Sequence, residues 1–154
     1  MGKQTIQSTC DELVQSFKKT AEKQALYQQI FTLGKEFQGL EDHQKDAKFL
    51  VKNCLSQAWL IPSYKEDKVY FAMDSDALIV KGVMSLLHRV YHDRTPEEIL
   101  SVDVDFWLNL GLVHLLSMNR RNGTLGLIKQ IRLYGVTYQA IHKTNQPPHP
   151  QPLT

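Results

Sequence analysis

Hydrophobic residues in the first part of the chain recur at the three- and four-residue spacing of amphipathic helices. Residues 8–23 place Leu13, Val14 and Phe17 on one face, after a polar start at 8–12 that resembles a capping box. Residues 23–37 carry a second and broader apolar face. Residues 39–48 are polar and are expected to form a loop. The pattern therefore predicts two helices followed by a loop.

Three short apolar runs follow this loop, at residues 49–51, 58–61 and 69–73. Pro62 is expected to end the second run, and the charged residues before the third run are typical of a turn. The links between the runs are too short for helical crossovers, so the pattern predicts a three-stranded antiparallel meander. The first link contains Cys54, which is therefore expected at or beside a strand-to-strand turn.

The chain then becomes helical again. Residues 74–76 (DSD) offer N-cap candidates for a helix that continues to Tyr91. Residues 95–98 (TPEE) combine a threonine cap, a proline in the first position and the glutamate that completes a capping box. This segment predicts a short helix at residues 97–100.

A further short helix is expected at residues 105–110 and a break near Gly111, while Asn122 and Gly123 are expected to mark the boundary before a final helix. The predicted fold is α+β, a two-layer domain with a small three-stranded antiparallel sheet packed against helices. Residues 1–143 are expected to form this single domain. Residues 144–154 contain four of the six prolines and are expected to be a disordered tail.

Composition and charge narrow the function classes. The chain has 154 residues and a formal charge of +2, which gives no electrostatic indication of nucleic-acid or anionic-membrane binding. Its two cysteines are too few for a disulfide framework or a four-cysteine zinc site. The start lacks the apolar stretch of a secretory signal, and no window has the ~20 apolar residues of a membrane span. We therefore expect a cytoplasmic protein with free thiols.

The two cysteines differ in their surroundings. Cys54 lies in a polar stretch between two apolar runs, where a thiol is either a small core hydrophobe or a functional group. Cys10 lies beside Asp11 and Glu12, whose negative charges oppose thiolate formation, so we interpret Cys10 as incidental.

Other site patterns are weaker. His88 and His92 are one helical turn apart, but Arg89 occupies the position of the glutamate in the zinc-protease helix motif. A solvated helix face explains this pair without a metal, and we expect no metal site. The chain also lacks the phosphate-loop and dinucleotide-binding glycine motifs, so nucleotide binding has no support.

Four segments in order resemble one known family, the SufE-type cysteine desulfuration proteins. Residues 53–59 (NCLSQAW) resemble the family's Gly-Cys-x-Ser-x-x-Trp signature, with Asn53 at the place of the glycine. The other three segments are residues 74–82 (DSDALIVKG), 95–99 (TPEEI) and 116–123 (LSMNRRNG), the last with Met118 where proline is common.

This resemblance implies a SufE/NifU-like fold and a function in iron–sulfur cluster assembly. Cys54 would accept sulfur as a persulfide from a cysteine desulfurase (SufS-like), and the sulfur would pass to an iron–sulfur scaffold complex (SufBCD-like). Pyridoxal phosphate would belong to the desulfurase, and this chain would hold no cofactor. The side chains expected to support the loop or bind the partner are Ser56, Gln57, Asp74, Asp76 and Arg120.

One alternative function remains open at this level, since the chain could activate a desulfurase without carrying sulfur. Its oligomeric state is also open, and it could work alone or as a homodimer. A thiol oxidoreductase ranks lower, because the sequence has no Cys-x-x-Cys motif. A cluster scaffold is disfavoured, because it would need about three thiolates near one another.

Overall fold

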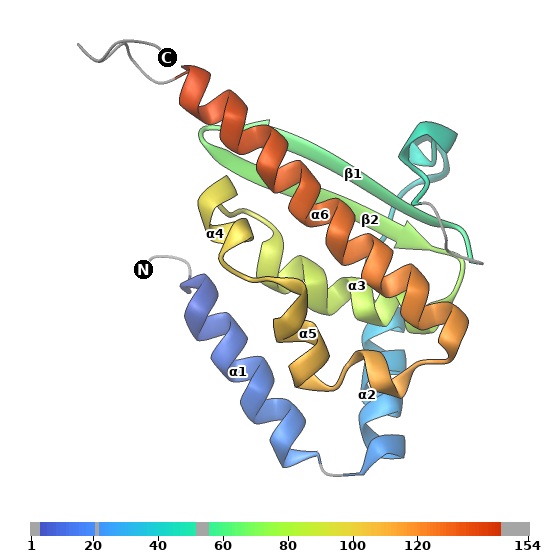
Figure 1. Cartoon of the computed structure of the whole chain (residues 1–154). Coiled ribbons are helices and arrows are strands. Elements are labelled where there is room, and N and C mark those ends of the chain that lie inside the picture. Colours follow the sequence, from blue (N-terminus) through green and yellow to red (C-terminus); the bar gives the residue numbers. More distant parts are fainter. Residues whose placement is uncertain (1–3, 21, 52–55, 146–154) are drawn as a thin grey trace.

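The computed structural model describes residues 4–20, 22–51 and 56–145, and Figure 1 shows how they are arranged. Helices pack against one face of a long β-hairpin, and helix α6 runs along the outside of the molecule across that hairpin. The elements in chain order are α1 (Ile6–Lys19), α2 (Lys23–Glu36), the 3-10 turns η1 (Asp42–Gln44) and η2 (Ala47–Phe49), β1 (Ala58–Lys65), β2 (Lys68–Ser75), α3 (Leu78–Tyr91), α4 (Pro96–Leu100), α5 (Val104–Leu110), the 3-10 turn η3 (Val113–Leu115) and α6 (Met118–Asn145).

The sheet consists of two antiparallel strands, with Lys65 opposite Lys68 and Trp59 opposite Asp74. In β2, Val69, Phe71 and Met73 are buried, whereas the residues between them are partly exposed. The buried residues therefore lie on the face of the hairpin that the helices cover, and the partly exposed residues lie on its other face. The α+β class and the two-layer arrangement are therefore confirmed.

The predicted third strand at residues 49–51 is wrong, since the described residues form two strands only. The Asp46 side chain accepts a hydrogen bond from the backbone N–H of Lys48 and starts the turn η2, which takes up residue 49. Leu50 then forms an isolated bridge to Trp59, and pairing of this segment goes no further among the described residues. A local cap thus outweighs the β-propensity of a three-residue run.

The predicted end of the second strand at Pro62 is also wrong, because β1 continues to Lys65. Proline cannot donate a ladder hydrogen bond, but it is tolerated in a strand that has a full partner on one side only. The hairpin turn lies at Glu66 and Asp67, whose φ angles of 52° and 66° are those of a tight two-residue turn.

Helix boundaries differ from the predicted ones at three places, two of which concern caps. Thr5, rather than the segment 8–12, caps α1 by accepting from the N–H of Ser8. The N-cap of α3 is Ala77, because Asp74 and Ser75 complete β2.

Helix α6 runs without a break through Asn122 and Gly123, so the boundary predicted there is wrong. The apolar face of α6, which includes Leu127, Ile128 and Ile131, is buried in the core. Burial of that face outweighs the roughly 1 kcal/mol that a glycine costs inside a helix.

Two local predictions for the C-terminal half are confirmed. Thr95 and Glu98 form a complete capping box at α4. Gly111 ends α5 in the left-handed conformation, with φ of 91°. Helix α6 reaches Asn145, and residues 146–154, where most of the proline-rich tail was predicted, lie outside the described residues.

Helices α2 and α3 cross closely at two glycines. A Cβ atom on Gly34 would collide with the backbone of Leu78 and Gly82, and a Cβ atom on Gly82 would collide with the carbonyl group of Ile30. Only residues without a side chain fit this crossing, which holds α3 beneath the hairpin. None of the helices in the described parts of the chain is long and apolar enough to cross a membrane.

Candidate functional site

The two ends of the segment that contains Cys54 meet at the start of β1. The backbone N–H of Val51 donates to the carbonyl oxygen of Ala58 at 2.8 Å, and Leu50 bridges to Trp59. Cys54 belongs to the stretch 52–55, which lies outside the described residues. The structure therefore shows the frame in which this segment is anchored, with Val51 on one side of it and Ser56 on the other.

The carbonyl group of Gln57 is tied to the end of β2. Its oxygen accepts hydrogen bonds from the hydroxyl of Ser75 at 2.7 Å and from the backbone N–H of Asp76 at 3.2 Å. The hydroxyl of Ser75 in turn accepts from the N–H of Ala77 at 3.2 Å. The DSD segment and the signature segment around Cys54, separate in sequence, are thus brought together.

Asp74 is the buried centre of this region. Its carboxylate accepts hydrogen bonds from the backbone N–H of Leu40 at 2.9 Å and from that of Ser75 at 2.8 Å. The ammonium groups of Lys45 and Lys81 lie 3.6 Å and 3.4 Å from its two oxygens. We call Asp74, Lys45 and Lys81 the Asp74 cluster. It joins the loop after α2, the end of β2 and the first turn of α3.

The electrostatics of the cluster favour an ionised Asp74. Burial alone would raise the pKa of Asp74, but the hydrogen bonds from Leu40 and Ser75 and the nearby Lys81 and Lys45 together lower it. The ammonium group of Lys45 also lies 5.3 Å from the centroid of the Trp59 ring, on the strand that follows Cys54. The carboxylate therefore fixes both the backbone and the cationic side chains around it.

Gly39, the residue before Leu40, is also needed for the Asp74 cluster to form. Its φ angle is +68°, and a Cβ atom at this position would lie 2.7 Å from the Asp74 carboxylate. Glycine meets both the backbone and the space requirement, and it lets Leu40 present its N–H to the carboxylate.

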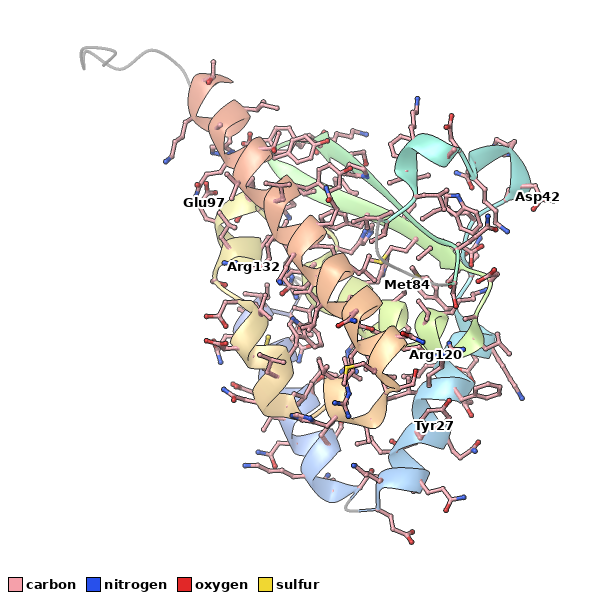
Figure 2. All side chains as sticks on the ribbon, turned by 45° about the vertical axis from the view of Figure 1, so that its right-hand side comes forward. Tyr27, Asp42, Met84, Glu97, Arg120 and Arg132 are labelled. Atoms are coloured by element: carbon pink, nitrogen blue, oxygen red, sulfur yellow. The ribbon has the colours of Figure 1, made fainter. Side chains whose placement is uncertain are left out.

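The remaining predicted site residues are placed differently. Ser56 is half-buried, and Gln57 and Asp76 are exposed. The Arg120 side chain belongs to α6 (Figure 2), and neither a hydrogen bond nor an ion pair among the described residues joins it to the Asp74 cluster. One of its terminal nitrogens is buried without a hydrogen-bond partner in the described parts of the chain. Its neighbour Arg121 instead binds the carbonyl oxygen of Leu116 and so holds the turn before α6.

Cys10 is unsuited to thiolate chemistry. It is 4% exposed in the core contact between α1 and the rest of the domain. Burial, together with the charge of Asp11, raises the pKa of Cys10 to about 11, although Arg94 opposes this in part. At neutral pH Cys10 is therefore a protonated core side chain.

His88 and His92 stack on each other with ring centroids 4.0 Å apart. The Nδ1 atom of His92 accepts a hydrogen bond from the backbone N–H of Phe71 at 3.0 Å, so that nitrogen holds β2. No group of three or more His, Cys, Asp or Glu side chains suited to a metal ion occurs among the described residues. The pair contributes to packing between α3 and the sheet.

Sequence reasoning missed the partners of Asp74. Lys45 and Leu40 belong to the stretch predicted as a plain polar loop, and their role depends on a contact with a strand about thirty residues later. Lys81 lies within the segment 74–82, so its signal was present in the sequence.

Comparison with known proteins shows the family of the chain. A family model described as SufE, an Fe-S metabolism associated domain, matches residues 11–134. The SufE-like protein 1 of Arabidopsis thaliana, chloroplastic/mitochondrial, is 34% identical over 119 residues, which are 77% of this chain and 32% of that protein. An uncharacterized SufE-like protein of Synechocystis is 28% identical over 139 residues, which are 90% of this chain and 87% of that one.

A solved structure shares the fold. The solution structure of a hypothetical protein from Thermus thermophilus has a TM-score of 0.70 at 16% identity and covers 86% of this chain and 96% of its own. This chain spans about a third of the length of the Arabidopsis relative, whose name places it in chloroplasts and mitochondria. The cytoplasmic location of this chain stays a prediction. With residues 11–134, most of its length, matched by the family model, the chain belongs to the SufE family of Fe-S metabolism.

Proposed function

We propose that the chain accepts sulfur on Cys54 from a pyridoxal-phosphate-dependent cysteine desulfurase, stimulates its turnover and passes the sulfur on for iron–sulfur cluster assembly. The observation that carries this proposal is the hydrogen bond between Ser75 and the carbonyl group of Gln57, three residues after Cys54. With the Asp74 cluster behind it, this bond supports a rigid base for the chain on one side of the reacting thiol.

The proposed step is an exchange between sulfur atoms. The Cys54 thiolate attacks the outer sulfur of a persulfide on the desulfurase, and a new S–S bond forms on Cys54 as the old one breaks. The electron pair of the broken bond leaves on the desulfurase cysteine as a thiolate, so no external oxidant or reductant is needed. The rate depends on the thiolate fraction of Cys54 and on its access to the partner.

The described residues around Cys54 would have two roles, to hold the backbone and to contact the partner. Ser75 and Asp74 hold the backbone on which the reacting segment is mounted. Asp76 and Gln57 are exposed beside it and offer polar groups to a partner. Pyridoxal phosphate would remain with the desulfurase, and the sulfur would leave for a scaffold complex of the SufBCD-like kind.

The test is the mass of the intact chain after incubation with a desulfurase and free cysteine. We expect a gain of one sulfur atom in the wild type, its loss in Cys54→Ser and its retention in Cys10→Ser, which is the matched control. A wild-type chain without the adduct, or an undiminished adduct in Cys54→Ser, would contradict the proposal.

The same variant separates the alternative of a non-carrying activator. That function predicts that Cys54→Ser still raises desulfurase turnover nearly as much as the wild type does. A thiol oxidoreductase that pairs Cys10 with Cys54 is disfavoured, because Cys10 is buried and protonated.

A further inference from the structure

The C-terminal part of the chain is electrostatically distinct from the rest. No Asp or Glu follows Asp105, and the last 49 residues contain five Lys and Arg residues. All five lie on α6, which is therefore a purely cationic helix despite the near-neutral charge of the chain. Of these five side chains, Lys129 and Lys143 are exposed, so a partner that approaches them meets positive charge.

Exposed apolar side chains lie on the same helix. Leu133 is 56% exposed and Val136 is 51% exposed, although both are large hydrophobic residues. They share one face of α6 with Lys129, because residues three, four and seven apart in a helix lie on the same side. Figure 1 shows α6 along the outside of the molecule. This face is apolar, cationic and open to a partner.

A groove lies between α6 and the segment 48–51. Its volume is about 430 Å³. Apolar side chains and two exposed lysines line it. The apolar lining includes Leu50, Leu60, Leu133 and Tyr134, and the lysines are Lys48 and Lys129. Leu50 is itself 37% exposed, so the open apolar face of α6 continues across the groove.

We propose that this surface, the α6 groove with Lys48, Lys129, Leu133 and Val136, docks an acidic amphipathic helix of a partner protein. An apolar side chain of that helix would fill the groove, and its carboxylates would meet the two lysines. The proposal goes beyond sulfur transfer, since the described residues of this surface include none of the side chains proposed for that transfer and binding to it needs no persulfide.

Other occupants fit the charges less well. A second copy of this chain, docked by the same face, would bring Lys48 and Lys129 against identical cations. The residues 146–154 carry no acidic side chain that could pair with the lysines. An anionic lipid surface satisfies the charges, but a flat surface leaves a concave groove unfilled.

The test uses the full-length protein and a designed helical peptide with Leu and Phe on one face and Glu on the other. We expect NMR shifts concentrated at Leu50, Val51, Lys129, Leu133 and Val136. Lys48→Glu/Lys129→Glu should weaken binding about tenfold or more, and a peptide with Lys in place of Glu should restore binding to this double variant. Lys18→Glu/Lys19→Glu, two exposed positions on α1, is the matched control.

Three results would overturn the proposal. One is peptide binding that is insensitive to the double charge reversal on the α6 groove while the control behaves the same. Another is binding to phosphatidylglycerol vesicles that depends on Lys48 and Lys129 while the peptide does not bind. The third is a dimer in sedimentation that Leu133→Glu dissociates, since the face would then belong to a second copy.

Discussion

The hydroxyl of Ser75 donates a 2.7 Å hydrogen bond to the carbonyl oxygen of Gln57 and so joins the end of β2 to the residue before β1. The same oxygen accepts from the backbone N–H of Asp76, so two donors from one strand end hold it. The proposed transfer requires an accurately placed thiol, and this is favoured by a fixed backbone on either side of it. Ser75 holds the backbone on one of these sides.

Ser75→Ala should therefore reduce sulfur transfer more than it reduces stability. It removes the bond from the hydroxyl to Gln57 and the bond that the hydroxyl accepts from the N–H of Ala77, while Gln57 keeps its bond from Asp76, so we expect a stability loss of about 1–2 kcal/mol. Sulfur acceptance, measured as the rate of persulfide formation by intact mass, should fall severalfold, because the backbone at Gln57, three residues after Cys54, is held by one hydrogen bond fewer. Ser101→Ala removes the hydroxyl bond that the exposed C-cap residue of α4 donates to Glu98, away from the Cys54 segment, and is the control. Equal effects of the two variants on transfer would argue against this role of Ser75.

Asp74→Ala should destabilise the fold strongly. The carboxylate is buried, and its removal leaves the N–H groups of Leu40 and Ser75 without their acceptor. It also takes the counter-ion from Lys81 and the more buried of two counter-ions from Lys45. Losing one partner of a buried network costs about 3–5 kcal/mol, and urea unfolding measures it.

Asp42→Ala is the matched control for this experiment. Asp42 also pairs with Lys45, at 3.5 Å, but its side chain is fully exposed. An exposed ion pair contributes about 0–1 kcal/mol, so this variant should unfold close to the wild type. If the two substitutions cost the same, the Asp74 cluster is not the anchor described above.

Because the pKa of Asp74 is lowered in the folded state, part of the free energy of unfolding depends on pH. Because its pKa is lower in the folded state than the ordinary value of 3.8, its contribution is fully present above that value and is lost as the pH falls through the folded pKa. Unfolding free energies of the wild type should therefore drop between about pH 4 and pH 2, the acid range of carboxylates. Asp74→Asn should show a smaller drop. Parallel curves for the two proteins would contradict this assignment.

The structure shows where sequence patterns suffice and where they do not. The capping box of Thr95 and Glu98 depends on four consecutive residues, so the sequence predicts it completely. The role of Asp74 depends on Leu40 and Lys45, which no periodicity connects to it. The prediction of a third strand is wrong for a local reason, because the Asp46 cap forms a turn where a strand was expected. Features that depend on neighbouring residues can thus be predicted from the sequence. The partners of a carboxylate shared by three elements can be identified only in the folded structure.

Cys10 should resist modification in the native protein. Its pKa of about 11, raised mainly by burial, leaves it almost fully protonated at pH 8, and the surrounding core excludes reagents. In the Cys54→Ser variant, iodoacetamide at pH 8 should therefore add no label to the folded chain and one label after denaturation in urea. Intact mass measures both states. Rapid labelling of the folded variant would show that α1 opens or that Cys10 is a thiolate, and it would restore Cys10 as a candidate partner for Cys54.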